Sequence, residues 1–247
     1  MLSRNFSLQS VGNIDWIREC YNFDAIAFSI DELIVFNVER EKKDVKEFSR
    51  NLIELSKRCF MPIAAGGGIR SIEDAYMILD AGADKLVINT PVITNPELVI
   101  SFIKTFGSQC IVASIDYKKH DRHTETFIHD GSHSTGLTVE EHVKKAERLN
   151  CGEIYLTSMD NDGTGEGLDL DIIKKISEVS MVPLIASGGI GKFNHFTDGI
   201  LQGKADAVST ANLFNFIEDG LTDARSTMQK CSIDMASWDI DFFKSFK

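Results

Sequence analysis

The chain has 247 residues, of which 43% are hydrophobic and 26% are charged, and its formal net charge is −11 at pH 7. This length is enough for one domain with a sizeable core, whereas so acidic a chain argues against general affinity for nucleic acid, which needs clustered lysine and arginine. No signal peptide opens the sequence and no apolar run is long enough to span a membrane, so we expect a cytoplasmic protein without a membrane segment.

From residue 33 onward, short apolar segments alternate with amphipathic ones. Apolar runs of this kind are typical of strands buried on both faces, and they occur at Leu33–Val38, Pro62–Ala65, Leu86–Asn89, Ile111–Asp116, Ile154–Ser158, Pro183–Ala186 and Ala207–Ser209. Apolar residues at three-to-four spacing predict helices at Val45–Arg58, Ile72–Leu79, Pro96–Thr105, Val139–Leu149 and Leu170–Val179. The alternation predicts an α/β fold with a parallel sheet, and the polar stretch His120–Gly136 is expected to form a small excursion above it.

An internal repeat is the most informative feature of the sequence. The segments Met61–Ile69 and Val182–Ile190 match at an offset of 121 residues, and the same offset joins Gly82 to Gly203. Two halves of about four βα units each predict a (β/α)₈ TIM barrel with a two-fold internal repeat. We expect a single barrel domain over residues 1–247, with a first half at about 1–106, a second half at about 107–230 and a C-terminal tail at 231–247.

The same offset predicts that one strand is missing. The counterpart of Ile111–Asp116 would precede the first residue, so the first strand of the barrel is expected to be absent from this sequence. Phe6–Gly12 is then predicted to be the remainder of the first loop, and Ile14–Phe28 the first helix. Because an open barrel exposes two sheet edges, we expect the chain alone to be marginally stable.

Glycine pairs follow two of the predicted strands. Glycine lets backbone N–H groups approach a phosphate closely, and the loops after the last barrel strands commonly bind one. One predicted phosphate site therefore comprises Gly67, Gly68, Asn89 and Thr90, and its copy comprises Gly188, Gly189, Thr210, Ala211 and Asn212. Two sites predict a small ligand with a phosphate at each end, although the glycines alone would also be explained by tight turns.

Two carboxylates are the best acid/base candidates. Asp116 ends a predicted strand and Asp162 follows another, so both are expected at the C-terminal rim, where barrel chemistry takes place. Asp162 precedes a glycine, and a role as a turn former stays equally open for it.

These motifs together resemble the cyclase subunit of imidazole glycerol phosphate synthase. The resemblance extends from about Asn5 to Phe214 and rests on the segments Gly66–Ile69, Gly82–Lys85, Ile88–Thr90, Thr105–Gln109, Ile115–Asp116, Gly152–Ile154, Leu156–Ser158, Asp160–Thr164 and Ala186–Gly189. It implies a (β/α)₈ barrel that takes ammonia from a separate glutaminase subunit as a heterodimer. Members of this family use the ammonia in histidine biosynthesis to convert a bisphosphorylated ribulosyl precursor to imidazole glycerol phosphate and aminoimidazole carboxamide ribotide.

The resemblance also implies roles for individual residues. Asp116 matches a catalytic aspartate, while Asp162 and Gly163 match positions that contact the substrate. The phosphate positions of the family fall on Gly68, Asn89 and Thr90 and on Gly189, Ala211 and Asn212. A charged gate for ammonia at the N-terminal face would comprise Glu32, Lys85 and Glu153, with Asp84 facing the glutaminase. From the residues alone, such charges would more often be ordinary solvated strand ends.

Departures from the family pattern keep two alternatives open. The second catalytic aspartate, a nearby lysine and a gate arginine of the family lie at or just after the first strand, and Asn37 stands where the family usually has an aspartate. One alternative is a related branch that delivers ammonia for amidation of a bacterial surface sugar. The other is a phosphate-binding scaffold, without catalytic activity, for a glutaminase partner.

We predict no metal site and no cofactor. The four histidines of residues 120–133 lack regular ligand spacing, and the five cysteines include no C-x-x-C pair, so solvated histidines and reduced core thiols are the simpler interpretation. The aromatic residues of Ser237–Lys247 fit either a packed terminal helix or a binding surface.

Overall fold

The computed structural model describes residues 2–4, 7–9, 29–40, 43–57, 59–120, 123–211 and 220–236. Within these ranges, no helix combines the length and apolar character needed to cross a membrane. The predicted first helix Ile14–Phe28, the site residue Asn212 and the tail Ser237–Lys247 lie outside the described residues.

A curled parallel sheet forms the centre of the molecule. All seven strands predicted from the sequence are present, in the spatial order β11-β10-β9-β6-β5-β4-β3. Their bounds are Leu33–Phe36 (β3), Ile63–Gly66 (β4), Lys85–Ile88 (β5), Ile111–His120 (β6), Glu153–Ser158 (β9), Leu184–Ser187 (β10) and Ala207–Ser209 (β11). Every neighbouring pair in this series is parallel. The architecture is that of an α/β barrel, as predicted.

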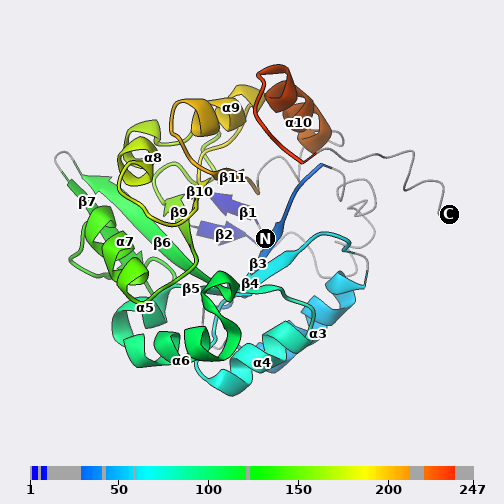
Figure 1. Ribbon diagram of the computed structural model, residues 1–247, viewed down its shortest axis with the longest axis vertical. Helices are drawn as coiled ribbons and strands as arrows, with labels where there is room; N and C mark the ends of the chain where they lie inside the picture. The colour runs from blue at the N-terminus through cyan, green and yellow to red at the C-terminus, as the bar shows by residue number, and fades with distance from the viewer. Residues whose placement is uncertain are drawn as a thin grey trace.

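Helices cover the outer face of this sheet (Figure 1). They are α3 (Val45–Ser56), α4 (Ile72–Asp80), α5 (Thr90–Thr94), α6 (Pro96–Phe106), α7 (Val139–Arg148), α8 (Leu170–Ser177), α9 (Phe193–Leu201) and α10 (Gly220–Lys230), with a short 3₁₀ turn at Ser108–Cys110. The five predicted helices are confirmed to within a few residues of their ends. Their starts are fixed by local capping, as at α7, where Thr138 and Glu141 form a reciprocal capping box.

The two-fold repeat is visible in hydrogen bonding at the strand starts. Asp84 Oδ2 accepts a hydrogen bond from the Ile63 N–H at 2.8 Å, and Asp206 Oδ2 accepts one from the Leu184 N–H at the same distance. Each aspartate immediately precedes one strand and binds the first residue of the preceding repeat-related strand, β4 for Asp84 and β10 for Asp206. Asp84 therefore has a structural role of its own, whatever it faces on the outside.

Among the described strands, the main sheet ends at β3 on one side and at β11 on the other. Arg225 of α10 bridges from the C-terminal part of the chain to the segment that precedes β3. Its guanidinium donates to the two carboxylate oxygens of Asp31 at 3.2 and 3.0 Å, and to the backbone oxygens of Ser29 and Ala236. This contact holds together two parts of the sequence almost 200 residues apart.

The polar excursion is a β-hairpin that continues the central strand β6. Strand β7 (His123–Ile128) pairs antiparallel with the end of β6, and β8 (His133–Ser134) pairs with β7. The hairpin is anchored to α7, where His142 Nδ1 lies 3.0 Å from Thr126 Oγ1 in a fully buried contact. The predicted excursion is confirmed, and it brings a loop, residues 129–132, to the rim.

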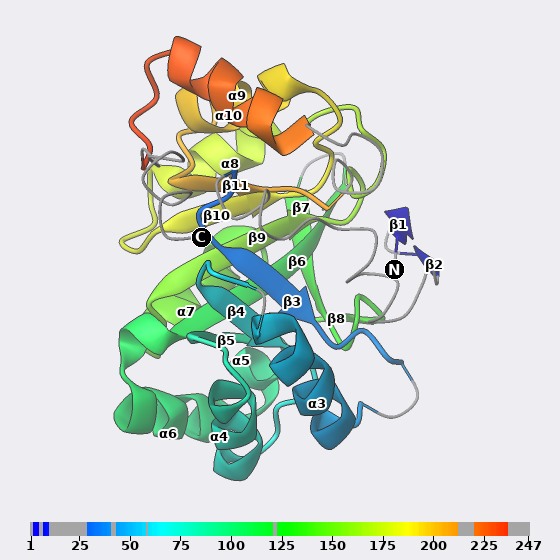
Figure 2. The ribbon, with the colours of Figure 1, turned by 90° about the vertical axis from the view of Figure 1, so that its right-hand side faces the viewer.

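The N-terminal segment contributes a separate two-stranded sheet. Strand β1 (Leu2–Arg4) pairs with β2 (Ser7–Gln9) and stands apart from the main sheet (Figure 2).

The expectation of core cysteines is wrong for Cys231, which is exposed because it follows the last turn of α10, whereas Cys110 and Cys151 are buried.

Candidate active site

A cavity of about 1920 Å³ runs along the inside of the curled sheet, is lined by residues from both ends of the strands, and extends to residues of α3, α9 and α10. Almost all of the residues predicted for the rim line it, namely Gly67, Gly68, Asn89, Thr90, Asp116, Asp162, Gly163, Gly188, Gly189, Thr210 and Ala211. These residues come from six different strand ends, so the fold gathers groups that are far apart in the sequence. Asn212, the remaining predicted phosphate residue, lies outside the described residues.

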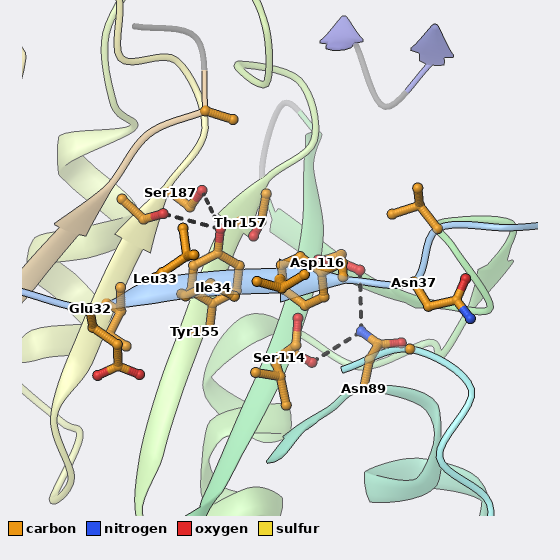
Figure 3. A pocket seen from close by; sticks show the side chains of 18 of the residues that line it. Glu32, Leu33, Ile34, Asn37, Asn89, Ser114, Asp116, Tyr155, Thr157 and Ser187 are labelled. Atoms are coloured by element: carbon orange, nitrogen blue, oxygen red, sulfur yellow. Dashed lines mark hydrogen bonds between the residues drawn. The ribbon is translucent and has the colours of Figure 1, made fainter. Parts of the chain in front are cut away.

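Asp116 is the most perturbed carboxyl at this rim. Its side chain is buried, and Asn89 Nδ2 donates to Asp116 Oδ2 at 3.2 Å and to the Ser114 carbonyl at 3.0 Å (Figure 3). Burial raises the pKa of Asp116 to about 7, helped by the nearby negative charges of Asp130 and Asp162. A carboxyl group with such a pKa can both release and accept a proton near neutral pH.

The two glycine loops have the backbone that the repeat predicts. Gly67 and Gly68 have φ of 102° and 87°, and Gly188 and Gly189 have φ of 96° and 104°. A side chain would also be obstructed, since a Cβ at Gly188 would lie 2.6 Å from the Ser158 carbonyl oxygen. The fold itself therefore requires glycine at these positions, and their phosphate binding stays a proposal.

The interior of the sheet below the rim is mostly apolar. One layer of inward-facing side chains comprises Ile34, Ala64, Val87, Val112, Tyr155 and Ile185. Tyr155 extends from this layer toward the rim, and its hydroxyl donates to Ser187 Oγ at 2.9 Å (Figure 3). Thr157 lies two residues further along the same strand and is paired with Asp116 in the sheet register. Its hydroxyl is buried without a hydrogen-bond partner. Sequence patterns gave no indication of this polar pair.

At the opposite end of the strands, the three predicted gate residues form one ion cluster. Lys85 Nζ lies 2.8 Å from Glu32 Oε2 and 2.7 Å from Glu153 Oε1, and all three side chains are mostly buried. Burial raises the pKa of Glu32 despite its bond to Lys85. Burial would lower the pKa of Lys85, but its two hydrogen bonds to glutamates outweigh this effect and raise it. These residues are thus paired with one another and are not independent solvated strand ends.

Two charged residues of the rim were not predicted. Lys43, in the loop between β3 and α3, forms an ion pair with Asp130 of the hairpin loop. Both line the cavity beside Gly68 and Thr90. Lys43 lies in a charged run and Asp130 in an ordinary Asp-Gly turn sequence, so neither had a distinguishing signal in the sequence.

The histidines of the hairpin associate in pairs. The rings of His120 and His123 are 5.0 Å apart, and those of His129 and His133 are 5.1 Å apart. Among the described residues, no group of three or more His, Cys, Asp or Glu side chains is arranged to hold a metal ion.

The comparisons with known proteins give the family of the chain. A family model described as "Histidine biosynthesis protein" matches residues 23–218. The chain belongs to the histidine biosynthesis protein family. A relative from Parasynechococcus marenigrum (strain WH8102) is 39% identical over 246 residues, which cover 99% of this chain and 91% of the relative. It is named "Putative imidazole glycerol phosphate synthase subunit hisF2". The resemblance to the imidazole glycerol phosphate synthase barrels that the sequence motifs indicated is therefore confirmed.

Proposed function

We propose that this chain is the ammonia-accepting cyclase subunit of an imidazole glycerol phosphate synthase. In this role it would combine a ribulosyl bisphosphate precursor with glutamine-derived ammonia, and release imidazole glycerol phosphate and aminoimidazole carboxamide ribotide. The observation that carries the proposal is Asp116, a buried carboxyl with a pKa near 7 inside a cavity between two glycine loops.

Asp116 supplies the proton transfers in this proposal. Breaking a carbon–nitrogen bond and closing an imidazole ring both require protons to be added and removed near neutral pH. Asn89 holds the Asp116 carboxyl in place, and Asp162 faces the same cavity from the loop after β9.

The glycine loops would bind the two phosphates of the substrate. Gly68, Asn89 and Thr90 line one part of the cavity, and Gly189 and Ala211 line another, related by the internal repeat. Backbone N–H groups in loops of this kind bind phosphate without needing a basic surface, which suits a chain with a net charge of −11.

Ammonia would enter from the N-terminal face, supplied by a glutaminase subunit. The cluster of Glu32, Lys85 and Glu153 stands at that face, and the apolar layer around Tyr155 lies between it and Asp116. An apolar layer favours neutral ammonia over ammonium, because an unpaired cation is costly to desolvate.

The test is turnover of the ribulosyl bisphosphate with an ammonium salt, followed by detection of both products. Whatever turnover the wild-type chain gives should fall a hundredfold or more in Asp116→Asn, which keeps the shape and the contact with Asn89 but cannot transfer the proton. Equal turnover by the two proteins would reject Asp116 as the acid/base group.

One observation favours a second candidate, delivery of ammonia for amidation of a surface sugar. Asn37 is buried, and its side-chain oxygen accepts a hydrogen bond from the Glu39 N–H at 3.2 Å, so it is engaged in its own turn. This turn replaces the acidic group that the family usually presents there. A chain that stimulates a glutaminase but gives neither product from the ribulosyl bisphosphate would support the second candidate.

A further inference from the structure

Two loops are joined by an ion pair across one side of the cavity. Lys43, in the loop between β3 and α3, places its Nζ 2.5 Å from Oδ1 of Asp130, in the loop between β7 and β8. The lysine side chain is only 15% exposed, whereas the aspartate is 36% exposed. The cation therefore lies on the inner side of the pair and the carboxylate on the outer side.

This ion pair belongs to the same corner of the cavity as the first phosphate site. A Cβ built on Gly68 would lie 2.7 Å from the Cβ of Lys43, so the glycine and the lysine are in direct contact. From the other side, the His129 N–H donates to Thr90 Oγ1 at 3.1 Å. Gly68, Lys43, Asp130 and Thr90 thus enclose one space.

At the second phosphate site, the position that the repeat matches to Lys43 is uncharged. At the repeat offset of 121 residues, Thr164 occupies the position that matches Lys43, and its hydroxyl donates to the Asn161 carbonyl at 2.7 Å. The first site therefore carries a charge arrangement that the internal repeat does not explain.

A carboxylate and a phosphate compete for the same cation in such an arrangement. A buried lysine beside a glycine turn is a strong partner for phosphate, but Asp130 already neutralises it and would repel an incoming anion. The influence of Asp130 also reaches Asp116, whose pKa it raises while Lys43 lowers it.

We propose that Lys43 is the cation of the first phosphate site and that Asp130 is its built-in competitor, a carboxylate that an entering phosphate displaces. The inference rests on the proposed function only in that the ligand carries a phosphate. A dianionic phosphate displaces the carboxylate more effectively than a singly charged anion, so the pair makes the first site selective for phosphate. Displacement also frees the hairpin loop from Lys43 only when this site is occupied.

The test is calorimetric titration with inorganic phosphate on five proteins: wild type, Lys43→Met, Asp130→Asn, the double variant and Glu125→Gln. Glu125 is the matched control, because it is a carboxylate of the same hairpin that does not line the cavity. We expect affinity to rise about tenfold in Asp130→Asn and to fall about tenfold in Lys43→Met, with no change in Glu125→Gln. The gain from Asp130→Asn should shrink when Lys43 is already replaced.

Each result decides the inference. Unchanged or weaker phosphate binding by a folded Asp130→Asn protein overturns it, as does an equal gain in the presence and absence of Lys43. No binding by any of the five proteins also overturns it, whereas binding by Asp130→Asn and not by wild type supports it. The proposed function is judged separately by turnover. If the wild-type protein turns over the ribulosyl bisphosphate but Asp130→Asn binds phosphate no more tightly than wild type, the proposed function stands and this inference fails.

Discussion

Replacing Asp116 by asparagine should stabilise the unliganded protein at alkaline pH, even though it removes the proposed acid/base group. The folded chain holds this carboxyl with a pKa of about 7, against 3.8 as the ordinary value. Between these pH values the native state keeps a proton on Asp116 that the unfolded chain has released, so the contribution of Asp116 to wild-type stability falls as the pH rises through this window. At about 1.4 kcal/mol per pKa unit, the full difference above pH 7 is about 4 kcal/mol.

Urea unfolding at pH 5 and pH 8 measures this directly. The stability advantage of Asp116→Asn over wild type should grow between the two pH values, by about 3 kcal/mol on the same basis. Asp80→Asn is the control, because Asp80 is exposed at the end of α4 and should show no comparable change. An advantage that is the same at both pH values would refute burial of a charged carboxyl as the cause.

Three further predictions concern stability. Gly189→Ala should lower the free energy of unfolding by about 2 kcal/mol or more, measured with urea, because its new Cβ would collide with a neighbouring backbone carbonyl. Arg225→Met should cost about 2–3 kcal/mol in the same assay, since the buried guanidinium bridges to Asp31 and to two carbonyls across the sequence. His142 is fully buried, and burial lowers its pKa from 6.5 to about 4, so the contribution of His142 to wild-type stability should fall by about 3 kcal/mol as the pH drops from 6.5 to 4, opposite in sign to that of Asp116, and His142→Gln should lack this contribution.

Matched variants separate these causes from general damage. Gly136→Ala, at φ of 68° with open space around it, should cost less than Gly189→Ala, and equal costs would show that backbone strain alone acts at both sites. Arg225→Lys keeps the charge but not the paired geometry, so full stability in that variant would contradict the bridging role. A pH dependence of stability between pH 4 and 6.5 that is the same in His142→Gln and wild type would contradict this role of His142.

Most of the fold could be predicted because it depends on local and repeated patterns. The seven strands are short apolar runs, and the repeat between Met61–Ile69 and Val182–Ile190 indicated their arrangement in a barrel. The expectation of burial is wrong for β3 and β11, which are partly exposed because they are the outermost of the described strands of the main sheet. Helix α9 was not predicted, because Phe193–Leu201 consists mostly of residues with low intrinsic helix propensity, among them Gly199. It forms because its buried face packs against β11 and the neighbouring helix α10, which is a tertiary effect.

The candidate site was predictable only where a side chain is fixed by its position on a strand. Asp116 and Asn89 follow from strand ends, and the structure brings them within hydrogen-bond distance. Lys43 and Asp130 reach the same cavity from two loops, 87 residues apart, and no local pattern encodes how loops meet. Loop contacts depend on the path of the whole chain, which the periodicity of strands and helices does not specify.

Several features of the cavity are costly to an empty protein, and they share one explanation. Asp116 is buried, which favours its protonated form, and the hydroxyls of Thr157 and Thr210 are buried without hydrogen-bond partners. Groups of this kind persist when a ligand or solvent completes them, because unsatisfied buried polar atoms otherwise destabilise a fold. All three line one cavity, whereas the glycines beside them are required by backbone geometry alone. The buried hydroxyls of Thr157 and Thr210 therefore support a binding site in this cavity independently of the glycine motifs that first indicated it.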